Sequence, residues 1–238
     1  MRGEPGNGPR CGRKAEGNVR GKNKHRIYEN IVKRGMDICL AALALLLLSP
    51  LALVCALLIK LEEPGASILY RDRRNGKDGR EFLVLKFRTM KNGLSGKDLT
   101  PVPGTLTRTG KVLRTLSLDE IPQFVNILRG EMSFIGPRPL PTVYYPWFSE
   151  SERRRFDVRP GLTGLAQVSG RANLNWDERF VLDVRYVEGM SFVQDMRICI
   201  RTVLVVFRHE DVIIEDETEN VDFDVYRKRQ LEALRAQS

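Results

Sequence analysis

One segment dominates the pattern of hydrophobic and polar positions along the chain. Residues 38–59 read ICLAALALLLLSPLALVCALLI, and no charged residue stands between Asp37 and Lys60. As one α-helix this segment would be about 33 Å long, close to the roughly 30 Å hydrocarbon core of a bilayer. We expect the helix to begin near Tyr28 and to end at the Glu62-Glu63-Pro64-Gly65 sequence. A signal peptide is a poor interpretation, because the segment starts late and no small-residue cleavage site follows it.

The centre of this segment carries a Ser49-Pro50 pair. Proline removes one backbone hydrogen bond and clashes with the preceding helical turn, so the helix is expected to kink or break there. Each half would be about 14–17 Å long, too short to cross a bilayer. Lysine and arginine residues flank both ends, as is typical of cytoplasmic segments. Two interpretations stay open on these grounds: a kinked membrane span, or a re-entrant helix-break-helix hairpin whose ends lie on one side.

Beyond residue 63 the pattern predicts short strands followed by amphipathic helices. Two strand-like stretches joined by a glycine-containing loop predict a β-hairpin, Ser67–Arg71 and Glu81–Arg88. Periodicity predicts helices at Leu106–Leu116, Leu118–Leu128, Ser149–Phe156, Asn175–Glu188 and Ser191–His209. A stiff loop is expected at Gly136–Pro139, and mobile or irregular structure at 92–105 and Arg159–Gly170. The predicted fold class is therefore α+β, mainly helical, with a short β-hairpin.

Composition excludes a collagen, a low-complexity polymer and a wholly disordered chain, since 42% of residues are hydrophobic and 29% are charged. The formal net charge of +9 is unevenly distributed. Residues 1–26 hold eight Lys/Arg and two Glu, whereas residues 209–224 hold eight acids and no Lys or Arg. A protein with an excess of positive charge is expected to bind anionic partners such as phosphates, nucleic acid or an anionic membrane surface. The four cysteines show no CxxC or Cys/His spacing, which favours a reducing, cytoplasmic setting over disulfides or zinc.

These shifts in composition divide the chain into four parts. Residues 1–26 form a basic tail that is expected to be disordered, because it holds almost no large apolar side chains. Residues 27–63 form the membrane segment, residues 64–208 a cytoplasmic domain, and residues 209–238 an acidic belt with a C-terminal tail. The apolar patch Val203–Phe207 is expected in the domain core, with contact to the membrane surface as the alternative.

The first candidate for chemistry is a pair of acidic residues in the sequence Ser117-Leu118-Asp119-Glu120. This sequence matches a capping box, with Ser117 as the N-cap and Glu120 at the third helical position. Asp119 would then lie in the first helical turn, where backbone N–H groups favour a negative charge. An oriented, ionised carboxylate there is suited to act as a nucleophile or a metal ligand. Most such acids, however, only stabilise their helix.

Four cations give the acidic pair a context. Lys86 and Arg88 stand at the end of the second strand, Arg114 lies five residues before Asp119, and Arg138 lies between two prolines. Cations beside a carboxylate suit a phosphate ester, because they reduce the repulsion between the two anions and stabilise transferred charge. Taken singly, each of these cations is an ordinary solvated charge.

Several ordered motifs resemble the bacterial sugar transferase family, the monotopic polyprenyl-phosphate phosphoglycosyl transferases. The motifs are Lys86–Met90, Leu113–Glu120, Gly130–Pro139, Arg159–Gly164 and Gln167–Arg171. The similarity runs from about Tyr28 to Phe207, and without further transmembrane helices the chain resembles the small form of the family. The family's re-entrant membrane helix carries a Ser-Pro pair to which Ser49-Pro50 corresponds. The resemblance therefore favours an N-terminal re-entrant hairpin over a kinked span.

The resemblance implies a two-step phosphoryl transfer at the cytoplasmic face of the bacterial inner membrane. Asp119 would attack the β-phosphorus of a UDP-sugar and release UMP, and undecaprenyl phosphate would then take the phosphosugar from the aspartate. Glu120 completes the family's dyad, and Mg²⁺ is the implied cofactor with Asp119 as its ligand. The implied substrate-binding residues are Lys86, Arg88, Arg114, Arg138, Asp183 and Tyr186. The sugar, the glycan pathway and a homodimer are left open.

Two other functions are compatible with parts of the sequence. A single-pass membrane protein would use the basic tail to hold nucleic acid or anionic lipid, and a scaffold would organise a glycan-assembly machine. The tail lacks aromatic residues interleaved with its cations, so nucleic-acid binding is not expected. Release of UMP by membranes supplied with UDP-sugars, Mg²⁺ and undecaprenyl phosphate separates the enzyme from both alternatives.

Overall fold

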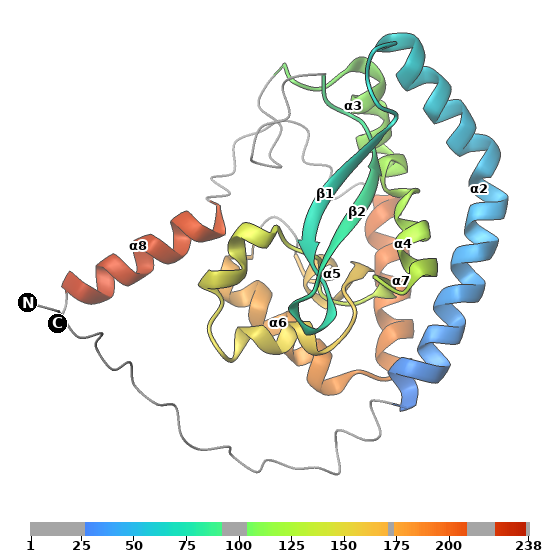
Figure 1. Cartoon of the computed structure of the whole chain (residues 1–238). Coiled ribbons are helices and arrows are strands. Elements are labelled where there is room, and N and C mark those ends of the chain that lie inside the picture. The colour runs from blue at the N-terminus through green and yellow to red at the C-terminus, as the bar shows by residue number, and fades with distance from the viewer. Residues whose placement is uncertain (1–26, 92–103, 171–173, 209–221, 237–238) are drawn as a thin grey trace, which may run out of the picture.

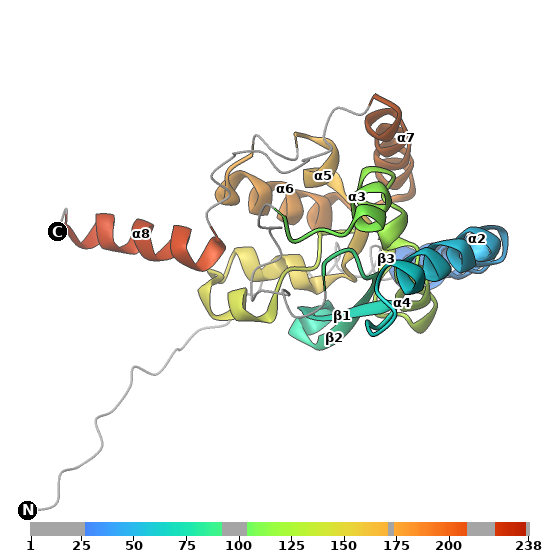
Figure 2. The same cartoon turned by 90° about the horizontal axis from the view of Figure 1, so that it is seen from above.

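The computed structural model describes residues 27–91, 104–170, 174–208 and 222–236. The expected basic tail, most of the loop at residues 92–105 and most of the acidic belt lie outside these residues. Helices predominate in the described part, accompanied by two small two-stranded sheets, which confirms a mainly helical fold with a short β-hairpin. Figures 1 and 2 both place the long helix α2 (Arg34–Glu62) at one edge of the molecule and helix α8 (Phe223–Ala236) at the opposite edge.

The apolar segment forms one long helix. A π-helical turn, η1 (Tyr28–Lys33), leads into α2 (Arg34–Glu62), and together they are long and apolar enough to cross a membrane. α2 continues through Pro50, and Figure 1 shows it curved rather than broken. The Ser49 hydroxyl donates to the Leu46 carbonyl (2.8 Å), the acceptor that Pro50, lacking an N–H, leaves open. The predicted helix-break-helix hairpin is therefore not confirmed, because local hydrogen bonding lets the helix continue.

One face of α2 packs against the rest of the domain. Ala41, Cys55 and Ile59 are at most 4% exposed. They belong to two apolar clusters shared with the hairpin and with helices α3 (Arg108–Thr115) and α4 (Gln123–Arg129). The opposite face is exposed and consists mainly of large apolar side chains, among them Leu43, Leu46, Leu47, Leu53, Leu57 and Leu61. α2 is thus a mostly exposed helix that packs one narrow face against the domain and presents large apolar side chains outward.

The hairpin follows α2 and is held against helix α4 (Gln123–Arg129). Strands β1 (Leu69–Asn75) and β2 (Glu81–Phe87) pair antiparallel through the turn η2 (Lys77–Gly79). The side chain of Asn126 on α4 bonds the edge of β2, accepting from the Leu85 N–H (3.0 Å) and donating to the Leu83 carbonyl (2.7 Å). These two bonds fix the end of β2 beside the chain that leads into α4.

The helix predicted at Leu118–Leu128 is split in two. α3 (Arg108–Thr115) is followed by a short 3₁₀ helix, η3 (Leu118–Glu120), and only then by α4, with Pro122 between them. Proline has no N–H to donate and fits best at a helix start, so α4 begins after it. α4 ends at Gly130, whose φ of 82° is the left-handed cap expected of glycine.

The second sheet pairs β3 (Ser133–Ile135) with β4 (Gly161–Thr163) in parallel. Its strands approach closely, since a Cβ on Gly136 would lie 2.4 Å from the Arg159 carbonyl oxygen. The loop after β3 therefore depends on glycine at this contact.

The remaining elements form the C-terminal half of the molecule. They are η4 (Thr142–Trp147), η5 (Glu152–Asp157), α5 (Leu165–Val168), α6 (Trp176–Gly189), α7 (Phe192–Arg208) and α8 (Phe223–Ala236). An aromatic core made largely by Tyr144, Phe148, Phe156, Phe180 and Phe223 joins η4, η5, α6 and α8. On α7, Val203 and Leu204 are about half exposed, so at these two positions the expected burial of the Val203–Phe207 patch is wrong.

Candidate active site

The acidic pair lies on η3, between α3 and α4. Ser117, directly before it, has a left-handed backbone (φ 54°), and its side chain makes no capping hydrogen bond. The predicted capping box is therefore wrong, because an N-cap residue needs an extended backbone to aim its side chain at the third helical N–H. A left-handed non-glycine residue costs about 1–2 kcal/mol. Backbone strain of this kind is concentrated at functional sites. Here the strained residue forms the turn between α3 and η3, two residues before Asp119.

Two cations converge on the pair from different elements. Lys86 Nζ, from the end of β2, lies 2.8 Å from Glu120 Oε1 and 3.9 Å from Asp119 Oδ2. Arg138 Nη2, from the loop after β3, lies 3.5 Å from the same Glu120 oxygen. Glu120 thus holds two cations in place, while Asp119 lies beside them with its side chain 11% exposed.

The loop that carries Arg138 is fixed through its backbone carbonyls. The Gly161 N–H donates to the Pro137 carbonyl (2.9 Å), the Arg155 guanidinium donates to the Arg138 carbonyl (2.7 Å), and Arg74 donates to the Pro139 carbonyl (3.1 Å). The two prolines also restrict the backbone on either side of Arg138. A stiff, non-helical loop was predicted here, and the structure confirms it.

Arg114 approaches the pair from α3. Gly110 lets α3 pass close to the hairpin, since a Cβ there would lie 2.0 Å from the Thr89 carbonyl oxygen. The Thr89 hydroxyl then accepts from Arg114 Nε (3.0 Å). Burial lowers the pKa of Arg114, and the charges of Asp119 and Glu120 oppose this shift. Arginine stays protonated in either case, so a third positive charge acts on the two carboxylates.

Burial raises the pKa of Asp119 above the usual range of an aspartate. Lys86 opposes this increase, Glu120 adds to it, and Arg114 and Arg138 oppose it further. The carboxylate is therefore largely desolvated yet surrounded by cations. A weakly hydrated anion beside fixed positive charges is the arrangement expected of an oxygen nucleophile that attacks an anionic phosphate.

The structure does not bring every predicted site residue to this cluster. Arg88 Nε donates to the Ser67 carbonyl (2.8 Å) at the base of the hairpin. Asp183 is 4% exposed and binds the Arg155 guanidinium (2.7 and 3.0 Å), and burial raises its pKa while Arg155 opposes the increase. Tyr186 is 1% exposed, with its hydroxyl 2.8 Å from Asp195 Oδ1. Direct substrate contact by Asp183 and Tyr186 is not supported by this geometry, and a positioning role fits it better.

Comparison with known protein families identifies the part of the chain that carries the acidic pair and its cations. A family model described as bacterial sugar transferase matches residues 28–209. The chain belongs to the bacterial sugar transferase family. All the residues of the cluster lie inside the matched range, whereas α8 lies outside it.

Named relatives differ in their sugars. The uncharacterized sugar transferase EpsL of Bacillus subtilis is 39% identical over 183 residues, 76% of this chain and 90% of EpsL. A UDP-glucose:undecaprenyl-phosphate glucose-1-phosphate transferase of Caulobacter vibrioides is 41% identical, covering 75% of this chain and 70% of that protein. A UDP-N-acetylgalactosamine-undecaprenyl-phosphate N-acetylgalactosaminephosphotransferase of Aeromonas hydrophila is 41% identical, covering 72% and 43%. Similar identity to proteins named for different sugars leaves the sugar of this transferase undetermined.

Sequence reasoning missed two residues that build the site of this sugar transferase. Arg155 lies in a charged run that reads as a solvated helix face, yet it is 3% exposed and bonded to both Asp183 and the Arg138 carbonyl. Thr89 lies inside the Lys86–Met90 motif, but nothing in that motif indicates that its hydroxyl is the partner of Arg114. The one available signal for Arg155 was the following Phe156, since a buried aromatic neighbour indicates that part of the charged run faces the core.

The acidic pair of this sugar transferase suits Mg²⁺ that is bound together with substrate phosphates. Among the described residues no group of three or more His, Cys, Asp or Glu side chains is placed to hold a metal ion. Mg²⁺ is usually bound by one or two carboxylates together with substrate phosphates, rather than by an all-protein site. The adjacent carboxylates of Asp119 and Glu120 meet that requirement.

Proposed function

We propose that this enzyme transfers a sugar phosphate from a UDP-sugar to undecaprenyl phosphate through a covalent intermediate on Asp119. The observation that carries the proposal is the buried Asp119 carboxylate on a strained turn, with Lys86, Arg114 and Arg138 around it. Family membership and the names of the Caulobacter and Aeromonas relatives support the same reaction.

The first step is a displacement at the β-phosphorus. An Asp119 oxygen forms a bond to that phosphorus as the bond to the oxygen bridging the two phosphates breaks, and UMP leaves with the bonding electrons. The phosphosugar is then esterified to the aspartate. A carboxylate nucleophile divides one difficult displacement into two easier ones.

The second step regenerates the enzyme. A phosphate oxygen of undecaprenyl phosphate attacks the same phosphorus, and the bond to Asp119 breaks, giving undecaprenyl-diphosphate-sugar and a free carboxylate. Lys86 and Arg138, held by Glu120, are placed to stabilise charge on the phosphoryl oxygens in both steps. Asp119 and Glu120 would hold Mg²⁺, which would supply neutralisation of diphosphate charge when bound.

The anchoring of α2 supports a monotopic association with the cytoplasmic face of the membrane. At its start, Arg34 donates to the Ile127 and Leu128 carbonyls (2.6 and 2.8 Å) at the end of α4. At its end, the Glu62 carboxylate accepts from the N–H groups of Arg108 and Thr109 (2.7 and 2.8 Å) at the start of α3. Attachment of both ends to one domain supports a placement of both ends on the same side of the bilayer.

Exposed apolar side chains also lie outside α2. Val112 is on α3, Leu116 directly follows α3, and Ile200, Val203 and Leu204 are on α7. A soluble nucleotide sugar and a lipid phosphate meet only at the membrane interface, so a domain lying on that interface suits the reaction. A re-entrant path of α2 into one leaflet remains the family expectation.

The test separates the covalent intermediate from direct transfer. Purified enzyme in lipid nanodiscs is incubated with Mg²⁺ and each of a panel of UDP-sugars, without undecaprenyl phosphate. We expect release of UMP limited to the amount of enzyme, and a phosphosugar mass on the peptide that contains Asp119. Asp119→Asn should abolish both, whereas Asp78→Asn, on the exposed hairpin turn, should change neither. UMP release that requires the lipid phosphate and leaves no modified peptide would refute the intermediate.

A further inference from the structure

Helix α8 lies outside the family match, yet its first residue is part of the domain core. Phe223 is fully buried, and its ring centroid lies 5.1 Å from that of Phe148 and 4.9 Å from that of Phe180. Tyr144 and Trp176 also contact this ring, at 5.7 and 5.4 Å. Phe223 therefore completes an aromatic core whose other buried members belong to the matched part of the chain.

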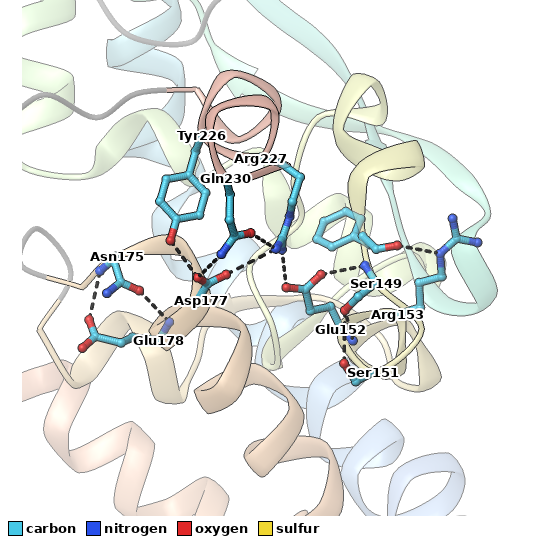
Figure 3. A network of polar contacts seen from close by, with 11 residues as sticks. Ser149, Ser151, Glu152, Arg153, Asn175, Asp177, Glu178, Tyr226, Arg227 and Gln230 are labelled. Carbon is cyan, nitrogen blue, oxygen red and sulfur yellow. Dashed lines mark hydrogen bonds and ion pairs between the residues drawn. The ribbon is translucent and has the colours of Figure 1, made fainter. Parts of the chain in front are cut away.

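Polar contacts surround this aromatic anchor and fix the first two turns of α8. Figure 3 shows three side chains of α8 directed at acidic residues of α6 and η5. The Tyr226 hydroxyl donates to Asp177 Oδ2 (2.7 Å), and Gln230 Nε2 donates to the same oxygen (3.2 Å). Arg227 pairs with Glu152 and lies 3.6 Å from Asp177 Oδ1. A buried aromatic ring inside a rim of ion pairs and hydrogen bonds makes α8 a docked element.

The aromatic core that α8 completes also holds a buried charge. The guanidinium carbon of Arg155 lies 5.4 Å from the ring centroids of Phe148, Phe156 and Phe180. Two of these rings, Phe148 and Phe180, contact Phe223 directly. Desolvated cation–π contacts contribute about 2 kcal/mol or more, so the orientation of these rings bears on the orientation of the Arg155 guanidinium.

Arg155 connects these aromatic rings to the candidate active site. Its Nη2 atom donates both to Asp183 Oδ2 (2.7 Å) and to the Arg138 carbonyl (2.7 Å). The neighbouring carbonyls of Pro137 and Pro139 are bound by other groups, so the bond from Arg155 is the one that acts on the Arg138 carbonyl itself. The Arg138 side chain then lies 3.5 Å from Glu120. A series of direct contacts therefore leads from Phe223 to the dyad.

We propose that α8 is a positioning element of the active site, which acts through Phe148, Phe180 and Arg155 on the placement of Arg138. The proposal rests on the proposed function for its catalytic consequence. Loss of the Phe223 ring leaves a cavity beside Phe148 and Phe180, into which these rings can turn. The Arg155 guanidinium then loses part of its support, and the Arg138 loop shifts. Displacement of a catalytic group by about 1 Å can cost roughly 100-fold in rate, so a small shift is measurable.

The first test is a double-mutant cycle between Phe223→Leu and Arg138→Ala in the full-length enzyme. Melting temperatures are measured for all four proteins, and UMP release is assayed well below the lowest of them. We expect Phe223→Leu to lower kcat/KM about tenfold in the parent and to have no further effect when Arg138 is already alanine. An equal loss in both backgrounds would overturn the proposal, because a merely structural role of α8 does not depend on Arg138.

A second measurement does not depend on the reaction. Hydrogen–deuterium exchange of the backbone around residues 136–140 should become faster in Phe223→Leu. It should also become faster in Arg227→Gln, which weakens the contacts of α8 with Glu152 and Asp177. It should be unchanged in Leu231→Ala, an exposed position on the same helix. Unchanged exchange in both Phe223→Leu and Arg227→Gln would refute positioning by α8. A parent enzyme that releases no UMP from any UDP-sugar would refute the proposed function instead, and the exchange data would still decide the role of α8.

Discussion

Removal of the Lys86 charge should change the pH dependence of the reaction, and the structure gives the size of the effect. Lys86 Nζ lies 3.9 Å from Asp119 Oδ2. At about 4 Å, two unit charges attract by about 1 kcal/mol in bulk water and about 4 kcal/mol at an effective dielectric constant of about 20. The two side chains are 25% and 11% exposed, so the effective value lies between these limits. Since one pKa unit corresponds to about 1.4 kcal/mol, loss of this attraction in Lys86→Met should raise the pKa of Asp119 measurably, in the same direction as burial does.

The direction in which the pH profile of activity moves follows from the proposed role of Asp119 as the nucleophile. The nucleophile must be ionised, so activity rises with pH as Asp119 loses its proton. Lys86 opposes the increase in pKa that burial causes. Without that charge, the carboxyl group keeps its proton to higher pH, and the acid limb of the activity profile moves upward.

The assay is the pH profile of kcat/KM for UMP release, which reports groups of the free enzyme. Lys86→Arg keeps the charge and should keep the acid limb near that of the parent, which separates electrostatics from loss of shape. A profile of Lys86→Met that falls uniformly at all pH values, with its acid limb unmoved, would show that Lys86 acts on substrate alone.

Three further predictions follow from burial and contact geometry. Arg155→Met should destabilise the protein by about 3–5 kcal/mol, because it leaves a buried carboxylate without its cation, and thermal unfolding should show a fall of at least several degrees. Arg88→Ala should retain most transferase activity and Arg114→Ala should lose most of it, since only the latter lies beside the dyad; equal losses in UMP release would contradict this placement. In a variant without native cysteines, Ile27→Cys and Gly65→Cys should both react with an impermeant maleimide in inverted vesicles and neither in intact cells, and labelling from opposite sides would refute a monotopic α2.

The periodic parts of the fold were predictable from the sequence. Alternation and a glycine-containing turn predicted the hairpin, and amphipathic spacing predicted α3, α6 and α7. The start of the long apolar helix near Tyr28 and its end at Glu62 were also predicted. Local physics is sufficient here, because periodicity and helix-ending residues act within a few positions along the chain.

The predictions that the structure did not bear out have a common cause. They depend on contacts that the spacing of residues along the sequence does not reveal. The Ser49-Pro50 pair indicated a break, but the Ser49 hydroxyl satisfies the carbonyl that proline leaves open, and α2 continues. Ser117 fitted a capping box, but its left-handed backbone between α3 and η3 does not aim the side chain at the third helical N–H. Lys86, Arg114 and Arg138 lie close to the acidic pair, as expected from the sequence, but Arg88, expected beside them, bonds the Ser67 carbonyl instead. The burial of Asp183 depends on the distant Arg155.

The two ends of α2 have a mechanical consequence for the dyad. Arg34 binds the end of α4 and Glu62 binds the start of α3, and these helices follow and precede the short turn that carries Asp119. Ile121, two residues beyond Asp119, belongs to the same buried apolar cluster as Cys55 and Ile59 of α2. A shift of α2 therefore bears on the position of Asp119, because the helix is attached on both sides of the turn that carries this carboxylate. With α2 at the membrane surface, as proposed above, the depth of the helix in the lipid would fix the height of Asp119 above it.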